Sequence, residues 1–523
     1  MLHPSAGFEV FQCLKALLKY AMMHQKDRKR ECTMTSPMLS RARAYETEKR
    51  QTISDEERPA FHLTGAVGWI NDPNGFSHYG GEYHLFYQSN PYDTHWGSIH
   101  WGHAKSRDML RWEYLPAALA PDMPYDGAGC FSGSAVALPD GRHLLMYTGV
   151  EHITRPDGTP ANLQAQCIAF GDGLNYEKDA RNPVITAADL PAGALDTDFR
   201  DPKIWQEPDG SFRVVLASDR GDGTGQILLY RSGDARKWEL VSVLDQSDGK
   251  LGGMWECPDF FPLEDRHILI TSPMNMEPQG LEFHPGHNVM ALIGSFDGRN
   301  FHREQVQNVD CGLDFYAPQT MLAPDGRRIL IGWMQNWATA SFVPAGAKYF
   351  GQLTLPRELS LQNGRLCQQP VRELEAYRKN RTAYQGVTLG EETALEGIRG
   401  SMIDLILTLH PEADCASIQI ALRKGGCHET TVTYLPKEQL LRLDRSRSGY
   451  RFDVIHTRDI PVQPEKGALE LRLILDRFSL ELFVGHGEQA ASAVLFTPPE
   501  EDGIVFRSQG SARMDIEKFD LTV

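Results

Sequence analysis

Three short motifs carry acids whose chemistry depends on how the fold brings them together. Asp72 lies in WINDPNG, Asp201 in FRDPK and Glu256 in WECPD. Asp-Pro-Asn-Gly on its own is typical of a turn, so the first motif alone predicts only a loop. Converging carboxylates can supply the acid and the nucleophile that cleave a glycosidic bond, or they can bind a hard cation such as Ca²⁺. Which chemistry applies depends on the elements that hold the three motifs.

A repeat along the chain indicates what these elements are. Short apolar strands follow polar turns at Gly81, Gly141, Gly210, Asp265 and Gly326. An aspartate followed four residues later by an aromatic residue recurs, at spacings of 64, 62 and 63 residues, at Asp108, Asp172, Asp234 and Asp297. A strand-rich repeat of this length with Asp-Gly turns favours a four-stranded blade. The sequence therefore predicts an all-β fold that begins with a five-bladed β-propeller.

The repeat also aligns the acidic motifs. Counting back nine residues from each hairpin turn reaches Asp72, Ser132, Asp201, Glu256 and Ala317. Because the first strand of each blade lines the central channel, we expect these side chains to converge at one end of the propeller. Counting seven residues forward reaches the next strand out, at Gln88, Thr148, Ala217, Ser272 and Trp333. A role in turns does not explain why acids recur at the inner position.

The predicted acidic pocket favours a sugar over a metal ion. Arg200 accompanies Asp201, and the motifs also supply several tryptophans: Trp69, Trp96, Trp101 and Trp333. Carboxylates accept hydrogen bonds from sugar hydroxyls, and indole faces pack against the C–H surface of a sugar ring. Ca²⁺ needs six to eight oxygen ligands, and the two histidines of HPGH (284–287) lack a third zinc ligand nearby. We therefore expect glycosidic chemistry without a metal or a cofactor.

Length and composition set the class of protein. A chain of 523 residues exceeds the usual size of one hydrophobic core, so two domains are expected. A net charge of −16 disfavours a nucleic-acid partner. Nine scattered cysteines without a C-x-x-C pair favour a reducing compartment, and Lys15 and Lys19 interrupt the apolar N-terminal run. These features predict a cytoplasmic protein without a membrane partner.

Five motifs in order resemble a known enzyme family. WINDPNG, FSGS (131–134), FRDPK, WECPD and IGWMQNW (331–337) are similar to the signature set of glycoside hydrolase family 32, the invertase, levanase and inulinase group. The resemblance covers roughly residues 55 to 520. It implies a five-bladed β-propeller followed by a C-terminal β-sandwich, and the repeat count reaches the propeller separately.

The resemblance and the strand patterns together divide the chain. Residues 1–54 are expected to form an N-terminal extension, partly helical or disordered, and residues 55–368 the catalytic propeller. A polar connector is expected at 369–386. Short alternating runs with frequent turns then predict a β-sandwich over 387–523, without a catalytic constellation of its own.

The resemblance also implies roles for the site residues. Family 32 enzymes retain anomeric configuration, which needs two carboxyls about 5 Å apart. Asp72 is expected to be the nucleophile and Glu256 the acid and then the base. Asp201 is expected to stabilise the transition state, with Arg200 as its counter-charge. Apart from the resemblance, Cys257 beside Glu256 is expected to be a packed side chain and not a nucleophile. The fructose pocket is expected to be shaped by Asn71, Gln88, Trp96, Phe131, Ser132 and Trp333.

The implied function is that of a retaining, exo-acting β-fructofuranosidase. It would hydrolyse terminal β-D-fructofuranosyl residues of sucrose and short fructo-oligosaccharides, and a homo-oligomer is possible. Within the family, a sucrose-6-phosphate hydrolase, a fructan exohydrolase and a fructosyltransferase remain open. An inactive carbohydrate-binding propeller is the alternative without catalysis, and WINDPNG together with WECPD disfavours a five-bladed arabinan hydrolase.

Overall fold

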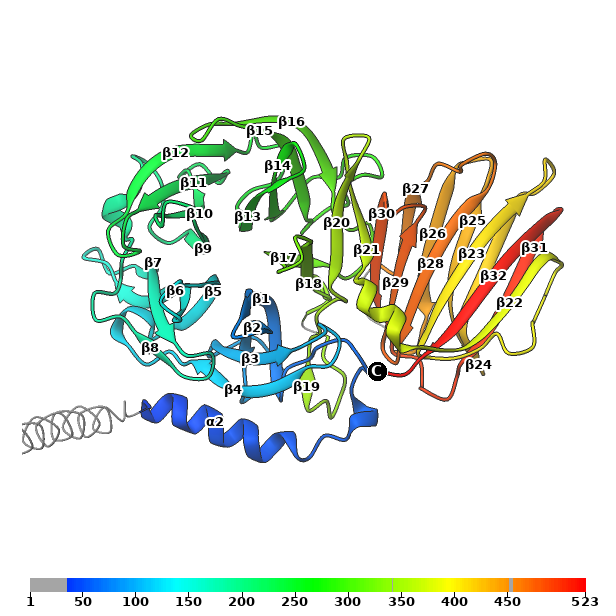
Figure 1. The fold of residues 1–523 in the computed structure, drawn as a ribbon, viewed down its shortest axis with the longest axis horizontal. Helices are drawn as coiled ribbons and strands as arrows, with labels where there is room; N and C mark the ends of the chain where they lie inside the picture. Colours follow the sequence, from blue (N-terminus) through cyan, green and yellow to red (C-terminus); the bar gives the residue numbers. More distant parts are fainter. Residues whose placement is uncertain (1–34, 341, 451–454) are drawn as a thin grey trace, which may run out of the picture.

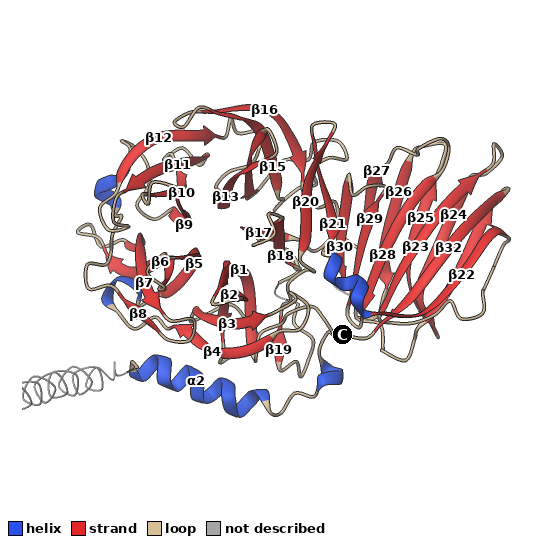
Figure 2. Cartoon of the chain, viewed as in Figure 1, coloured by secondary structure: helices blue, strands red, loops and turns tan. Residues whose placement is uncertain are grey.

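The computed structural model describes residues 35–340, 342–450 and 455–523. This part of the chain is nearly all-β (Figure 2), which confirms the predicted class. Its helical segments are α2 (Pro37–Arg50), η1 (Asp55–Glu57), η2 (Pro124–Asp126), η3 (Ala187–Asp189) and η4 (Arg372–Tyr377). Among these segments, none is long and apolar enough to cross a membrane. Most of the predicted N-terminal extension, residues 1–34, lies outside the described residues.

Five sheets stand around a common axis in the first part of the chain, which we call the five-sheet ring (Figure 1). Each sheet begins at the axis and ends at the outside, and the two-residue β19 is added in parallel to β1. From inside to outside the sheets are β1-β2-β3-β4, β5-β6-β7-β8, β9-β10-β11-β12, β13-β14-β15-β16 and β17-β18-β20-β21.

The strands of the ring have the following bounds. The first two sheets contain β1 (Gly68–Tyr79), β2 (Glu82–Asn90), β3 (His100–Ser106), β4 (Glu113–Leu119), β19 (Tyr349–Phe350), β5 (Gly129–Ala137), β6 (His143–Thr154), β7 (Pro160–Gly171) and β8 (Tyr176–Lys178). The other three contain β9 (Phe199–Gln206), β10 (Phe212–Asp219), β11 (Gly225–Ser232), β12 (Glu239–Gln246), β13 (Trp255–Leu263), β14 (Arg266–Pro273), β15 (Met290–Phe296), β16 (Phe301–Asn308), β17 (Tyr316–Leu322), β18 (Arg328–Trp333), β20 (Arg357–Gln362) and β21 (Arg365–Pro370).

Local sequence chemistry explains the recurring turn between the third and fourth strands. Asp108 Oδ1 accepts hydrogen bonds from the backbone N–H groups of Leu110 at 3.0 Å and Arg111 at 2.8 Å. The equivalent aspartates of the next three sheets accept the same two bonds, at Asp172, Asp234 and Asp297. Such turns satisfy backbone donors that the strands leave unpaired. The repeated aspartate in the sequence is therefore a turn signal.

Two packed antiparallel sheets form the C-terminal part, which we call the two-sheet domain (Figure 1). One sheet has the order β22-β32-β23-β28-β29-β30 and the other β27-β26-β25-β24-β31. Their bounds are β22 (Arg378–Thr388), β23 (Ile403–Pro411), β24 (Ser417–Gly425), β25 (His428–Leu435), β26 (Leu440–Arg447), β27 (Thr457–Pro461), β28 (Leu469–Asp476), β29 (Ser479–Val484), β30 (Gln489–Val494), β31 (Gly503–Gln509) and β32 (Ala512–Leu521). Apolar side chains from both sheets, such as Leu405 and Ile420, share one core.

The connector between the two parts is shorter than residues 369–386. β21 ends at Pro370, η4 follows, and β22 begins at Arg378 as an edge strand paired with β32. β22 is an edge strand with mostly exposed side chains, so its sequence is polar. This polar sequence explains why a connector was predicted for residues 369–386.

Buried charges join the ring to the two-sheet domain. His62 Nδ1 lies 2.9 Å from Asp476 and Nε2 lies 2.9 Å from Glu481. Arg357 donates to Glu481 at 2.5 Å and to Asp310 at 3.0 Å. All five side chains are fully removed from solvent. Since an unpaired buried charge is costly, this network favours one fixed orientation of the two parts.

Candidate active site

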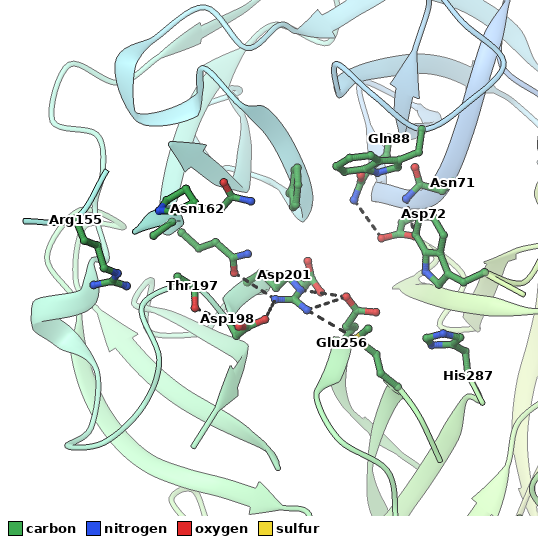
Figure 3. Close-up of a pocket in the computed structure, with 18 residues that line it drawn as sticks. Asn71, Asp72, Gln88, Arg155, Asn162, Thr197, Asp198, Asp201, Glu256 and His287 are labelled. Carbon is green, nitrogen blue, oxygen red and sulfur yellow. Dashed lines mark hydrogen bonds and ion pairs between the residues drawn. The ribbon is translucent and has the colours of Figure 1, made fainter. Parts of the chain in front are cut away.

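The inner strands of the ring deliver three acids to one cavity. Asp72 on β1, Asp201 on β9 and Glu256 on β13 all point into it (Figure 3). The cavity has a volume of about 960 Å³ and is lined by Asn71, Asp72, Gln88, Trp96, Phe131, Arg155, Pro160, Ala161, Asn162, Gln164, Thr197, Asp198, Arg200, Asp201, Glu256, Met274, His287 and Trp337. The structure therefore brings together the acids of the three motifs.

Asp72 is buried and held by several donors. Its Oδ1 accepts from Asn71 Nδ2 at 3.0 Å, and its Oδ2 accepts from Gln88 Nε2 at 3.2 Å and Ser132 Oγ at 2.5 Å. Burial raises the pKa of Asp72 to about 6, with a further contribution from the charge of Glu256, while the bonds from Ser132 and Asn71 oppose the rise. These donors fix the carboxylate, and Oδ1 accepts one of the three bonds while Oδ2 accepts two. Oδ1 is thus the oxygen with more room to react, as a nucleophile requires.

Asp201 shares a neighbour, Cys257, with Asp72. Its Oδ2 accepts the backbone N–H of Cys257 at 3.0 Å, and its own N–H donates to Thr148 Oγ1 at 2.9 Å. The Cys257 sulfur lies 3.5 Å from Asp72 Oδ2 and 3.6 Å from Asp201 Oδ2. Burial raises the pKa of Asp201 to about 7, although the charge of Arg200 opposes this.

Glu256 is fixed by a cation and a phenol. Its Oε1 accepts from Arg200 Nε at 3.1 Å and Nη2 at 3.0 Å, and its Oε2 accepts from the Tyr316 hydroxyl at 2.7 Å. Arg200 also donates to Asp198 at 2.9 Å. The expected pairing of Arg200 with Asp201 is corrected here, because its hydrogen bonds go to Glu256 and Asp198 while only its charge acts on Asp201.

The observed strand pairing corrects the predicted register of the acids. Strand pairing is interrupted just after Arg200 in β9 and just after Glu256 in β13. Inside these bulges Asp201 and Cys257 have left-handed backbones, with φ of 64° and 49°. Cys257 in β13 is therefore the structural equivalent of Asp201 in β9, and Glu256 is the equivalent of Arg200. The prediction of one shared position was wrong by one residue at Glu256, because the turn after β13 has two residues where the turns after β5, β9 and β17 have five.

The other predicted pocket residues divide into three groups. Asn71, Gln88, Trp96 and Phe131 line the cavity. Ser132 contacts Asp72 from the ring axis, outside the lining. Trp333 is fully buried behind the wall, with its ring centre 5.0 Å from that of the lining residue Trp337. Trp333 therefore supports the pocket through Trp337 rather than facing it.

Several lining residues were not predicted. Trp337 stands inside the IGWMQNW motif, so that motif contained a usable signal. Asn162 and Gln164 come from β7, whose pairing with β6 extends over twelve residues and raises a wall beside the acids. His287, considered only for zinc, lines the cavity with its ring centre 5.6 Å from that of Tyr316. No cluster of three or more His, Cys, Asp or Glu side chains suited to a metal ion occurs in the described ranges.

Family profiles match nearly the whole described chain. Residues 62–370 match the profile "Glycosyl hydrolases family 32 N-terminal domain", and residues 373–522 match "Glycosyl hydrolases family 32 C terminal". The chain belongs to glycoside hydrolase family 32. It is 38% identical to a sucrose-6-phosphate hydrolase of Escherichia coli over 87% of this chain and 92% of the relative. It is 39% identical to a raffinose invertase of Escherichia coli over 85% of this chain and 90% of the relative.

Solved structures of the family share the fold. A β-fructofuranosidase of Bombyx mori, solved in complex with sucrose, superposes with a TM-score of 0.79 at 35% identity, covering 92% of this chain and 98% of that one. An exo-inulinase of Aspergillus awamori superposes with a TM-score of 0.76 at 26% identity, covering 90% of this chain and 99% of that one. This family 32 protein is a glycoside hydrolase, and three carboxyl side chains line its cavity.

Proposed function

We propose that this family 32 glycoside hydrolase is a retaining, exo-acting β-fructofuranosidase that releases terminal β-D-fructofuranosyl residues from sucrose and short fructo-oligosaccharides. Its ring is proposed to be a five-bladed β-propeller and its two-sheet domain a β-sandwich. The observation that carries the proposal is the convergence of Asp72, Asp201 and Glu256 on one cavity, each with a different set of hydrogen-bond partners.

Asp72 and Glu256 divide the chemistry. Asp72 attacks the anomeric carbon of the fructosyl unit while Glu256 gives a proton to the departing oxygen. Glu256 then takes a proton from water, which displaces Asp72 and restores the original configuration. The bonds from Arg200 and Tyr316 hold the Glu256 carboxyl in position, and those from Asn71 and Ser132 do so for Asp72.

Asp201 stabilises the transition state. It reaches the cavity from β9, and its Oδ2 already accepts one backbone N–H, from Cys257. Its remaining lone pairs can accept sugar hydroxyls through charge-assisted hydrogen bonds. Bonds that tighten as the ring gains positive charge lower the barrier more than they assist binding.

The depth of the site supports action at chain ends. Beneath the acids, the ring axis narrows to a void of only about 10 Å³, bounded by Pro73, Pro202 and Pro258. A sugar cannot pass through a space of this size, so a fructan chain enters with its terminal unit first. The wide cavity above the acids leaves room for the rest of a short oligosaccharide.

The charges of the lining favour unphosphorylated sugars. Its two arginines are already paired, Arg155 with Asp196 at 2.6 Å and Arg200 with Glu256 at 3.0 Å. Burial lowers the pKa of the lining residue His287, which keeps its ring neutral. A phosphate would meet carboxylates without a spare cation in the described lining. Sucrose 6-phosphate remains the second candidate substrate because the Escherichia coli relative at 38% identity is a sucrose-6-phosphate hydrolase.

Fructose release from a panel of substrates tests the proposal. We expect the highest kcat/KM on sucrose or kestose, lower values on inulin and levan, and at least tenfold less on sucrose 6-phosphate. Asp72→Asn is the matched control, since it keeps the size of the side chain but should lose about three orders of magnitude in kcat. A preference for sucrose 6-phosphate would reverse the substrate assignment, and an active Asp72→Asn would reject the mechanism.

The free cysteines support a cytoplasmic location. All seven cysteines in the described ranges are unpaired: Cys130, Cys167, Cys257, Cys311, Cys367, Cys415 and Cys427. Free thiols persist in a reducing compartment. Cell fractionation should find the activity with cytoplasmic markers, and recovery from the culture medium would contradict this.

A further inference from the structure

α2 lies outside the ring and packs against the outer edge of the first sheet. The helix runs along β4, the outer edge strand, as Figure 1 shows. Arg43 Nε donates to the carbonyl of Ala117 at 2.8 Å, and Glu46 Oε2 accepts the N–H of the same residue at 3.2 Å. Both backbone groups of one edge residue are thereby satisfied from the helix. These bonds fix α2 against the sheet, so the helix can serve as a support for other parts.

The same helix contacts the loop between β2 and β3. The Tyr45 ring centre lies 5.1 Å from that of Tyr92 in an edge-to-face arrangement, and the Arg41 guanidinium lies 5.2 Å from the Tyr92 ring centre. From the sheet side, the ring centre of His100 lies 5.7 Å away. Tyr92 is thus held by two helical side chains and one strand residue.

The loop that begins near Tyr92 carries Trp96 to the mouth of the cavity. Asn90 Nδ2 donates to the carbonyl of His95 at 3.0 Å and so closes the loop on its own start. Gly97 follows, and a Cβ there would lie 2.7 Å from Asn90 Nδ2, so a larger residue would have to displace the amide that closes the loop. We therefore expect a displacement of Tyr92 to move Trp96, the residue between His95 and Gly97.

Trp96 itself has little else to hold it. Its side chain lines the cavity but is 48% exposed, and its ring centre lies 5.9 Å from that of Phe131 in an edge-to-face contact. An indole at a cavity mouth can pack against a sugar ring only if the loop beneath it is fixed. The position of Trp96 thus depends on the loop that α2 braces.

We propose that Arg41 and Tyr45 of α2 are positioning residues that act through Tyr92 to hold Trp96 in place for substrate. The inference rests on the proposed function, in which Trp96 contacts the sugar. α2 lies away from the three acids, on the outer edge of the first sheet, so its contribution is to substrate binding and not to the chemical step.

The test compares KM and kcat on sucrose for matched variants. Arg41→Ala combined with Tyr45→Ala should raise KM about three- to tenfold and leave kcat within about twofold, the range expected for one cation–π and one aromatic contact. Arg41→Lys with Tyr45→Phe keeps both contacts and should restore KM. Arg50→Ala is the control. Arg50 lies over Tyr114 of β4, 5.7 Å from its ring centre, so this substitution removes a contact of α2 that does not involve the loop.

The same variants in a Trp96→Ala background separate the possible failures. Once Trp96 is absent, the paired α2 substitution should have no further effect on KM. A full effect in that background, or a KM no different from that of Arg50→Ala, would overturn the positioning role alone. An unchanged KM for Trp96→Ala itself would reject both the sugar contact and the inference. Amide exchange at residues 92–99 should rise in the paired variant and not in Arg50→Ala, and an equal rise in both would also count against the positioning role.

Discussion

Burial makes Asp72 harder to ionise, although its proposed role requires the ionised form. Burial raises its pKa to about 6, and the bond from Ser132 is the largest opposing contribution. In the proposed mechanism Asp72 must be ionised to attack, so kcat/KM should fall as the pH drops through this range. The acidic limb of the pH profile therefore reports the surroundings of this carboxylate.

Ser132→Ala should move that acidic limb to higher pH. Ser132 Oγ stabilises the charged form through its 2.5 Å bond to Asp72, so its loss raises the pKa of the nucleophile. A hydrogen bond to a charged group contributes about 1.5–3 kcal/mol, which corresponds to a shift of roughly one to two pH units. Measurement of kcat/KM between pH 4 and 8 checks this.

Ser134→Ala provides the control for this shift. Ser134 lies two residues further along β5 and donates to the Pro202 carbonyl at 2.7 Å instead of to Asp72. The acidic limb of the kcat/KM profile should lie at the same pH in Ser134→Ala as in the parent enzyme. A limb that moves to lower pH in Ser132→Ala, or moves equally in both variants, would contradict the assignment.

At the scale of elements, local signals predicted the strands but not their exact register. Turns are set by a few neighbouring residues, as in the Gly-Gly turn after β1 and the turn at Asp108. The sequence therefore predicted where the hairpins lie and how they repeat. Counting missed the register of β13 because its turn is two residues long, whereas the turn after β9 has five. Side-chain positions also depend on contacts between sheets, such as the bond from the Cys257 N–H to Asp201, and no local signal shows these. For the same reason the sequence did not show that Arg200 would pair with Glu256, or that Trp333 would lie behind the wall.

α2 illustrates a packing cost that its sequence alone does not reveal. Glu46 is buried against β4, and burial raises its pKa to about 7 from an unfolded value near 4.5. Between these values the folded protein binds the proton more strongly than the unfolded chain does. The contribution of Glu46 to stability therefore falls as the pH rises from about 4.5 to 7 and is lowest above 7.

Glu46→Gln should stabilise the protein at pH 8 and have no effect near pH 4. The amide oxygen can still accept the Ala117 N–H without a buried charge, so the gain should be on the order of 1–3 kcal/mol. Thermal unfolding at the two pH values measures it. Glu48→Gln, on the exposed face of the same helix, should show no such difference between the two pH values. A Glu46→Gln variant that is less stable at pH 8 would contradict the account.

At the scale of the whole molecule, paired buried charges hold the ring against the two-sheet domain. Burial lowers the pKa of His62, but hydrogen bonds and charges from Asp476 and Glu481 outweigh it and raise the pKa to about 9. His62 is therefore charged at neutral pH. Its contribution to stability is complete below the unfolded value of about 6.5 and is lost as the pH rises through about 9.

His62→Gln should destabilise the protein most at neutral pH. Removing one member of a buried charge network costs about 3–5 kcal/mol, because the carboxylates of Asp476 and Glu481 lose a cation. The difference from the parent should shrink at pH 10, where His62 has lost its charge. Urea unfolding at pH 7 and pH 10 checks this, with His486→Gln, a largely exposed histidine of the same domain, as the control. A difference that grows with pH would contradict the sign.

The central claim, that Asp72 forms a covalent bond to the fructosyl unit, can be tested by trapping the intermediate. Glu256→Ala with β-D-fructofuranosyl fluoride should form the intermediate, since fluoride leaves without a strong acid, and should break it down slowly because the base is missing. Rapid quenching, proteolysis and mass spectrometry then locate the sugar. The account predicts a fructosyl group on the peptide that contains Asp72. A fructosyl group on Asp201, or fructose release without a labelled peptide at Asp72, would contradict it.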